Sequence, residues 1–341
     1  MEGSYARAFR RLGSQVTHWD VPAAIRRRVR GGRLGSFIND FWPSEAWIAK
    51  ANRDLLTLVF KVKPDILLVG GANRVTAGAL AQIRATLPDC RLVLIWPDPM
   101  IYCFSNVVQS LPLYDLVATY SKATVEPFLR LGAAKAAWVP LGFDGELHPP
   151  HAPASGREAE FSDCDVSFIG DYTPEREELA VKFIKAGIRI KIWGPVAWRR
   201  AAADRKALRS YWQGGPVFGA EFSLAMRSAP LALNPINAVS YPTANMRFFE
   251  IPGCGGVPLS ARCPEMEDEF PDGVACFYYD SPDGAVDIAR RLLADDSVRR
   301  RVAREGRDRV WKGHTYVHRA IHILSLIGSA SPVTAVGQSG R

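Results

Sequence analysis

The feature that most constrains the fold is an alternation of short apolar runs with helical patterns along almost the whole chain. Each apolar run has the length of a buried strand, and a helix-compatible stretch usually follows it. Such alternation predicts βαβ units, in which helices cover the faces of a parallel sheet, and so an α/β fold class. The runs expected to be strands are 65–71, 91–98, 114–120, 137–141, 165–170, 189–194, 231–236, 257–260 and 275–279.

A proline-rich stretch interrupts this alternation near the middle of the chain. The segment His148-Pro149-Pro150-His151-Ala152-Pro153 can continue neither a helix nor an interior strand. A length of 341 residues suggests two domains. The expected organisation is an N-terminal Rossmann-like domain (1–145), a linker (146–163), a C-terminal Rossmann-like domain (164–313), a closing helix (314–327) and a disordered tail (328–341). Two doubly wound domains would then face each other across a cleft that holds the ligand.

The beginning of the chain departs from the usual plan of such a domain. Residues 6–12 have a helical pattern, and residues 15–19 are a possible strand that ends at Asp20. A doubly wound domain normally opens with an apolar strand ahead of its first glycine-containing turn, and that strand is missing here. Either the first domain departs from the usual plan, or the sequence begins downstream of its true start.

Composition excludes several classes of protein. No apolar run approaches the roughly 20 residues that span a bilayer, and the N-terminus lacks a secretory pattern, so we expect a cytoplasmic location. The six cysteines form no Cys-x-x-Cys pair, which argues against a metal site and against a disulfide framework. Reduced, mostly buried thiols are the expected state.

The net charge of +8 is concentrated near the N-terminus, where five arginines fall close together. They are Arg26, Arg27, Arg28, Arg30 and Arg33. Such a cluster can contact an anionic membrane, a nucleic acid or a phosphorylated substrate, or it can be a solvated helix end. Because no nucleic-acid motif accompanies it, we expect no nucleic-acid partner and retain peripheral membrane contact as a hypothesis.

The segment 245–260 is the strongest functional signal. A helix-compatible stretch contains one carboxylate, Glu250, and the pair Gly255-Gly256 precedes an apolar run. We expect this order to place the carboxylate and exposed backbone N–H groups at the carboxyl edge of a parallel sheet. Open α/β folds bind nucleotides at that edge.

Five motifs occur in a fixed order in the second half of the chain. They are Phe168–Arg176, Ile192–Pro195, Leu233–Pro235, the set Asn245, Arg247, Phe249, Glu250 and Gly255-Gly256, and His314–Arg319. Together they resemble the C-terminal domain of two-domain GT-B glycosyltransferases, and more narrowly the group named after the spore maturation protein CgeB. The resemblance implies sugar transfer from a UDP- or GDP-linked donor, bound mainly by the second domain, to a glycan, a lipid-linked acceptor or a protein. It also implies a reaction without metal or other cofactor, mostly with retention at the anomeric carbon.

The resemblance assigns the donor-binding role first to Glu250. One carboxylate can accept hydrogen bonds from both vicinal hydroxyls of a ribose, and the alternative is a buried pair with Arg247. Either Arg247 or Arg176 is expected to neutralise the diphosphate leaving group, because no metal would do so. The other donor-site candidates are Gly170, Gly194, Gly255 and Gly256 in turns, Asn245 as a helix cap or donor contact, and Tyr241 and Thr243 in the adjoining loop. Pro242 stands where many members of the broader clan carry a second glutamate, so contacts to the sugar must differ.

Two further features have weaker assignments. Asp98 ends a predicted strand of the first domain, so it is either a catalytic base or acceptor-binding residue, or a turn residue before proline. The stripe His314, His318 and His322 on one helix lacks the pattern of a metal site, and packing is the expected role. His148 has no local constellation.

Two other functions share the same donor pocket. One is a sugar-nucleotide epimerase of GT-B fold, and the other is a nucleotide-sugar-binding protein without catalytic activity. Analysis of the product formed without acceptor separates the epimerase from the transferase.

Overall fold

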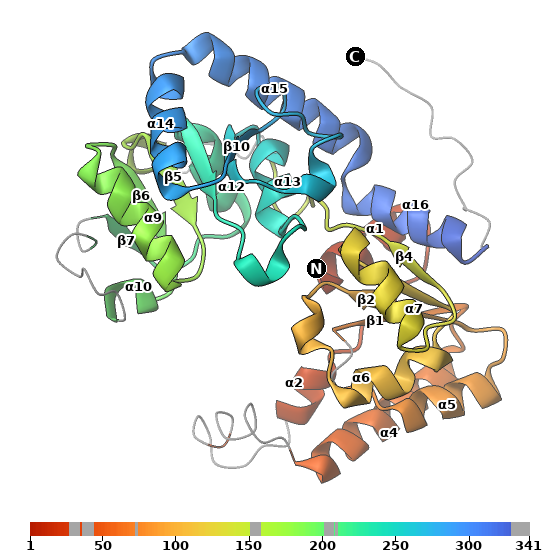
Figure 1. Ribbon diagram of the computed structural model, residues 1–341. Helices are drawn as coiled ribbons and strands as arrows, with labels where there is room; N and C mark the ends of the chain where they lie inside the picture. The colour runs from red at the N-terminus through yellow and green to blue at the C-terminus, as the bar shows by residue number, and fades with distance from the viewer. Residues whose placement is uncertain are drawn as a thin grey trace. The chain divides into compact units, whose positions relative to one another are not determined.

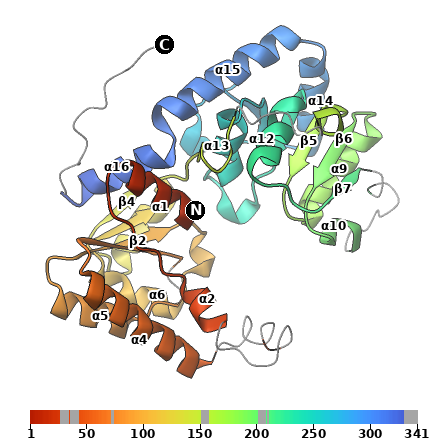
Figure 2. The ribbon, with the colours of Figure 1, turned by 180° about the vertical axis from the view of Figure 1, so that it is seen from behind.

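The computed structural model describes residues 1–26, 35, 44–71, 74–150, 158–200, 208 and 211–328. The chain forms two compact units, Met1–Pro140 with Ala320–Arg341, and Leu141–Arg319. Figures 1 and 2 show them from opposite sides. Most of the predicted arginine cluster (27–33) and the tail after 328 lie outside the described residues. Within the described ranges, no helix combines the length and the apolar character needed to cross a bilayer.

The first unit contains a parallel sheet whose strands follow one another in chain order. The order is β1-β2-β3-β4, with bounds Ile66–Gly70, Arg91–Trp96, Leu116–Thr119 and Ala136–Trp138. Among the described residues, no strand pairs with the other edge of β1. The possible strand at residues 15–19 has no regular secondary structure. Its alternation of polar and apolar residues does not supply the near-continuous apolar run that a parallel strand needs.

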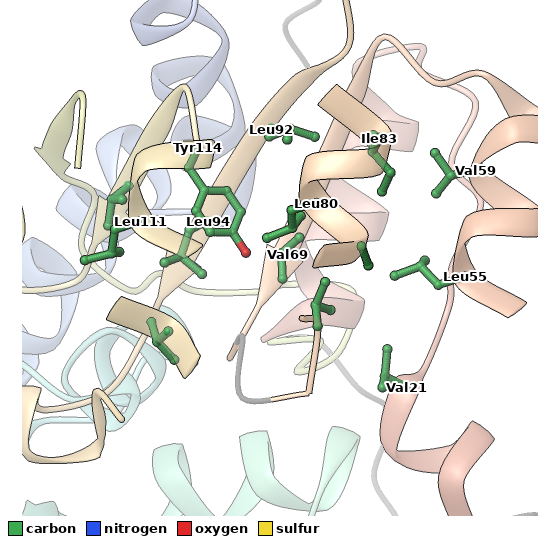
Figure 3. Close-up of a cluster of buried hydrophobic side chains, with 14 of the residues drawn as sticks. Val21, Leu55, Val59, Val69, Leu80, Ile83, Leu92, Leu94, Leu111 and Tyr114 are labelled. Carbon is green, nitrogen blue, oxygen red and sulfur yellow. The ribbon is translucent and has the colours of Figure 1, made fainter. Parts of the chain in front are cut away.

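One face of this sheet is covered by α4 (Glu45–Val62) and α5 (Ala77–Thr86). Alternate residues of a strand point to the same face of the sheet, and residues three or four apart lie on the same face of a helix. Apolar residues at these positions of the strands and helices pack against one another. Figure 3 shows these side chains converging between the strands and the two helices. They include Leu92 and Leu94 of β2, Leu80 and Ile83 of α5, and Leu55 and Val59 of α4.

The other face of the sheet carries α1 (Glu2–Arg11) and α16 (Tyr316–Leu326), which lie side by side in both views (Figures 1 and 2). Residues from Ala320 onward belong to the first unit, although they come from the end of the chain. The remaining helices of this unit are α2 (Val21–Arg26), η1 (Met100–Tyr102), α6 (Ser105–Ser110), η2 (Leu111–Leu113), η3 (Lys122–Thr124) and α7 (Val125–Arg130).

The second unit contains a larger parallel sheet in which the strand order reverses. The order is β10-β9-β8-β5-β6-β7, with β5 Val166–Ile169, β6 Ile190–Trp193, β7 Trp212–Gly214, β8 Leu231–Asn234, β9 Pro258–Ala261 and β10 Phe277–Tyr279. Every run expected to be a strand overlaps an observed strand in one of the two sheets. The unpredicted strand is β7, whose Trp-Gln-Gly sequence offers no apolar run.

Helices cover both faces of the second sheet. The face with Phe168 and Leu233 packs against α9 (Pro174–Lys185) and α14 (Pro282–Leu293). The opposite face packs against α12 (Gly219–Ser228) and α13 (Met246–Gly253), and α15 (Asp296–Gly313) lies against α13. The shorter elements are α8 (Glu158–Ser162), α10 (Ala197–Arg200), η4 (Ala238–Ser240) and η5 (Pro264–Met266).

The stretch 146–163, expected to be a linker, lies inside the second unit where the structure describes it. Its helix α8 packs against α12, and His148 is buried with 4% of its surface exposed. Proline prevents regular secondary structure but does not prevent packing. The two units meet at Pro140 and Leu141, shortly before the expected end of the first domain at residue 145.

Candidate functional site

The pair Gly255-Gly256 lies at the amino edge of the second sheet, opposite the edge that we expected. It connects the end of α13 to β9, and a helix that returns from the carboxyl edge of a parallel sheet ends at the amino edge. The N–H groups are already used, since Gly255 donates to Pro252 (2.8 Å) and Gly256 to Ile251 (2.9 Å). A Cβ at Gly256 would overlap the carbonyl oxygen of Met226. These glycines therefore serve a tight turn and close packing, and they offer no backbone donors to a ligand.

The carboxyl edge of the sheet carries two arginines at the point where the strand order reverses, between β5 and β8. Arg176 lies in the first turn of α9, which follows β5. It donates from Nη1 to the carbonyl of Asp171 (2.9 Å) and from Nη2 to that of Pro235 (3.4 Å), which follows β8. Arg247 lies in the first turn of α13, which follows β8, and its Nε donates to the carbonyl of Ile169 at the end of β5 (3.3 Å). Each guanidinium thus crosses the reversal point to the backbone of the other strand.

The two guanidinium groups are close enough to affect each other. Burial lowers the pKa of Arg176, and the positive charge of Arg247 lowers it further, against the opposite effect of Asp171. Arginine nevertheless stays charged at neutral pH. The Nε atom of Arg176 is buried and has no hydrogen-bond partner among the described residues. Two cations therefore lie together at the strand-order reversal, the place where open α/β sheets bind their ligands.

The carboxylate of Glu250 is enclosed, with 3% of its side chain exposed. Its Oε2 accepts from Nη1 of Arg247, and its Oε1 lies 3.4 Å from Nε2 of His148. Burial alone would raise the pKa of this carboxyl, but Arg247 and His148 together hold the pKa below its usual value. Of the two interpretations of Glu250, the pair with Arg247 is present. A contact with a ribose would require one oxygen to change its partner.

Asn245 caps α13, which is one of the two roles expected for it. Its Oδ1 accepts from the N–H of Phe248 (3.1 Å), and its Nδ2 donates to Oδ1 of Asn234 (2.9 Å) at the end of β8. In the preceding loop Thr243 is buried, whereas Tyr241 is 64% exposed. The peptide bond between Tyr241 and Pro242 is cis.

Gly170 and Gly194 follow strands, so they do lie at the carboxyl edge. A Cβ at Gly194 would overlap the carbonyl oxygen of Gly170, which also accepts from Nε1 of Trp198 (2.9 Å). Packing of one strand end against the next explains Gly194. A Cβ at Gly170 would lie 2.9 Å from the ring of Phe168 and 3.6 Å from Nη1 of Arg176. The Phe168 ring, and not the arginine, is therefore what a side chain at this position would displace.

In the first unit, Asp98 follows β2 and is exposed. Burial of its carboxyl by surrounding atoms raises its pKa, although the residue as a whole is exposed. The three histidines expected on one helix do not share one, because His314 is the C-cap of α15 while His318 and His322 lie on α16. His314 pairs with Glu269 (2.9 Å) and contacts Arg319, and Nδ1 of His318 lies 2.7 Å from Oγ1 of Thr315.

The residue that sequence reasoning missed is His148. Its Nδ1 lies 3.4 Å from the carbonyl oxygen of Gly219, its Nε2 faces Glu250, and its ring packs on Phe222 with centroids 4.4 Å apart. No local pattern marks it, because both partners come from helices distant in the sequence. Its burial is known only from the structure, so the sequence offered no signal that would have found it.

Two parallel α/β sheets in two units, the second with a reversed strand order, are the architecture of the GT-B fold. Residues 176–325 match a family model described as glycosyl transferase-like, and that range includes Arg176, Arg247 and Glu250. No curated protein matches the chain.

Several solved structures are similar. The Anabaena protein Alr3699/HepE in complex with UDP-glucose superposes with a TM-score of 0.62 at 13% identity, over 91% of this chain and 94% of that one. Sucrose-phosphate synthase from Thermosynechococcus elongatus has a TM-score of 0.61 at 12% identity, over 82% and 77%. A putative UDP-N-acetylglucosamine 2-epimerase from Listeria monocytogenes has a TM-score of 0.51 at 14% identity, over 82% and 78%. At these identities the likeness concerns the fold.

Proposed function

We propose that this chain transfers a sugar from a nucleoside diphosphate sugar to a hydroxyl group of an acceptor. The observation that carries the proposal is the reciprocal crossing of Arg176 and Arg247 over the reversal point between β5 and β8. A nucleoside diphosphate is a ligand whose charge matches two adjacent guanidinium groups at the carboxyl edge of an open sheet.

The proposed reaction breaks the bond between the anomeric carbon and the diphosphate oxygen and forms a bond from that carbon to the acceptor oxygen. The acceptor hydroxyl gives its proton to a base, for which Asp98 is the candidate, or to the departing diphosphate oxygen, and the nucleoside diphosphate leaves with the electron pair of the broken bond. Negative charge grows on the departing diphosphate in the transition state. The two guanidinium groups and the N-terminus of α9 would stabilise that charge without a metal ion.

The donor is proposed from a similar solved structure, and the narrower family and the acceptor are proposed from the sequence motifs. The HepE structure contains UDP-glucose, so a UDP-linked sugar is the first donor to test and a GDP-linked sugar the second. We propose a CgeB-like enzyme that retains the anomeric configuration, acts in the cytoplasm and uses a glycan, a lipid-linked acceptor or a protein. Asp98 of the first unit is the proposed acceptor-side residue, as base or binding group.

The test measures binding of UDP, GDP and their glucose and mannose conjugates by calorimetry, followed by slow hydrolysis of the donor that binds. The wild-type protein should bind one nucleoside diphosphate, and Arg176→Ala should weaken that binding. The matched control is Arg189→Ala, since Arg189 lies in the same unit at the amino end of β6, pairs with Asp165 and is 61% exposed. Absence of binding to every one of these ligands would overturn the proposal.

The epimerase remains a second candidate, because the similar fold from Listeria monocytogenes is described as a putative epimerase. Incubation of a bound UDP-sugar without acceptor separates the two functions. An epimerase changes the configuration of the sugar while the diphosphate stays attached, whereas a transferase releases the nucleoside diphosphate. Binding without either product would instead indicate a nucleotide-sugar-binding protein.

A further inference from the structure

A buried chain of polar contacts links three side chains of the second unit: His148, Glu250 and Arg247. We infer that His148 is a positioning residue that acts through Glu250 to hold the Arg247 guanidinium at the end of β5. This inference rests on the proposed function, because it assigns Arg247 to the diphosphate of the donor.

His148 is fixed in one place by several contacts. Its backbone N–H donates to the carbonyl of Asp144 (2.9 Å), and the Asp144 carboxylate accepts from the N–H groups of Glu146 and Leu147 (3.1 Å each). The imidazole ring packs on Phe222. A compact turn and an aromatic contact therefore determine where the ring nitrogens point.

Both ring nitrogens of His148 face oxygen atoms that accept hydrogen bonds. A carbonyl oxygen can only accept, so the Gly219 oxygen, 3.4 Å away, is an acceptor for a proton on Nδ1. Oε1 of Glu250 lies 3.4 Å from Nε2 and is an acceptor for a proton on that nitrogen. A proton on Nε2 satisfies the oxygen of Glu250 that Arg247 does not bind.

The carboxylate needs this second donor because it is buried. An ionised oxygen without a partner away from water is strongly unfavourable. If His148 no longer supplied a donor, Glu250 would draw more of the Arg247 guanidinium to itself. That guanidinium also lies over the ring of Phe222 at 4.5 Å and donates to Ile169, so a shift toward Glu250 would weaken both contacts.

Of the three linked side chains, solvent exposure shows that Arg247 can contact a ligand and that Glu250 and His148 are enclosed. The Arg247 side chain is 28% exposed, whereas those of Glu250 and His148 are 3% and 5% exposed. A donor molecule can therefore reach Arg247, and the other two act on the donor through it. The effect should concern the diphosphate and leave contacts with the nucleoside unchanged.

Three substitutions of His148 each keep a different one of its contacts. His148→Gln places an amide donor near the Nε2 position, toward Glu250. His148→Asn places one near the Nδ1 position, toward Gly219, and leaves Glu250 without its second donor. His148→Phe keeps the ring on Phe222 and removes both hydrogen bonds.

The experiment compares equilibrium dissociation constants for UDP and for uridine, or for GDP and guanosine if the wild type prefers guanine. His148→Asn and His148→Phe should weaken binding of the diphosphate about tenfold and leave nucleoside binding unchanged, while His148→Gln should stay within about threefold of wild type. In an Arg247→Ala background, His148→Asn should have no further effect on diphosphate binding, because Arg247, through which His148 acts, is already absent. Together these variants form a double-mutant cycle.

Several results would overturn the inference. Equal losses of nucleoside and diphosphate binding would show that Glu250 contacts the ribose or that His148 is only structural. Unchanged diphosphate binding in all three variants, together with weaker binding in Arg247→Ala, would remove the positioning role and leave the proposed function standing. A wild-type protein that binds no nucleotide would overturn the proposed function and this inference with it.

Discussion

The two sheets of this molecule are built alike at one edge and differently at the other. At the amino edge, each sheet has an aspartate that pairs with an arginine and accepts a backbone N–H: Asp115 with Arg84 in the first unit, and Asp165 with Arg189 in the second. At the carboxyl edge, the consecutive order of the first sheet contrasts with the reversed order of the second.

This difference explains where the candidate site lies. Where the strand order reverses, the connections after two neighbouring strands leave in opposite directions and separate, which leaves room for a ligand. Both crossing arginines are found there. The first sheet has no such reversal among the described residues, and its candidate residue Asp98 lies at the end of a single strand.

The largest expected effect comes from removing a cation at the reversal point. Arg247→Ala should lower kcat/KM about a thousandfold, since one charged donor aimed at a developing anion is worth roughly 4 kcal/mol. The measurement is donor turnover at subsaturating concentration. The control is Arg91→Ala, which changes an exposed arginine of the first unit. Comparable losses of kcat/KM in Arg247→Ala and Arg91→Ala would show that the carboxyl edge of the second sheet has no special role in the reaction.

The next effect concerns stability of the second unit. Gly194→Ala should lower the free energy of unfolding by about 3 kcal/mol, because its Cβ would overlap the backbone oxygen of Gly170. Gly215→Ala is the matched control, since a Cβ at Gly215 meets nothing within 4 Å. Urea unfolding followed by far-UV circular dichroism measures both. Equal stability of the two variants would mean that the strand ends of β5 and β6 are not closely packed.

A third prediction addresses the first unit. Asp98→Asn should lower kcat about a hundredfold, the range for loss of a general base, with donor affinity unchanged. Asp89→Asn, an exposed aspartate before β2, is the control and should behave as wild type. The measurement is turnover at saturating donor together with donor affinity. An unchanged kcat in Asp98→Asn would make Asp98 a turn residue and leave the first unit without an assigned chemical role.

The smallest effect tests the similarity of the two amino edges. Burial raises the pKa of Asp115 and of Asp165, but hydrogen bonds from Arg84 and Arg189 and from backbone N–H groups lower both pKa values below the usual one. Each carboxylate therefore stabilises the fold above an unfolded pKa of about 3.9, and that stability disappears as the pH falls through the folded pKa.

Asp115→Asn and Asp165→Asn should each cost about 1 kcal/mol at neutral pH, a value reduced for the solvent exposure of the arginines. The difference from wild type should shrink in acid below about pH 4. Urea titrations at neutral and acid pH measure it. A difference that stays constant with pH would show that the charge of the carboxylate is not involved.

Sequence reasoning succeeded where the information is local and directional. Apolar runs located the strands, and capping was one of the two roles expected of Asn245. Arg176 and Arg247 were both placed at the carboxyl edge of the sheet, and their contact with a diphosphate stays a prediction. Gly255 and Gly256 were expected at the carboxyl edge of the sheet, but they follow a helix and therefore lie at the amino edge. Gly170 and Gly194 follow strands, so they lie at the carboxyl edge as expected.

The contacts of His148 could not be derived from its neighbours in the sequence. They exist because two helices, α12 and α13, bring Gly219 and Glu250 to a turn that has no periodic pattern. The short strand β7 was missed for a similar reason, since its pairing with β6 and not its own sequence makes it a strand.

The return of the chain into the first unit has a consequence for biosynthesis. The buried residues Ala320, Ile323 and Leu324 of α16 belong to the unit that begins at Met1. During translation, the continuous segment Leu141–Arg319 emerges whole and can fold at once, whereas the first unit is completed only after α16 has left the ribosome. A premature stop shortly before residue 320 would therefore spare the proposed donor site and damage the part of the protein that was made first.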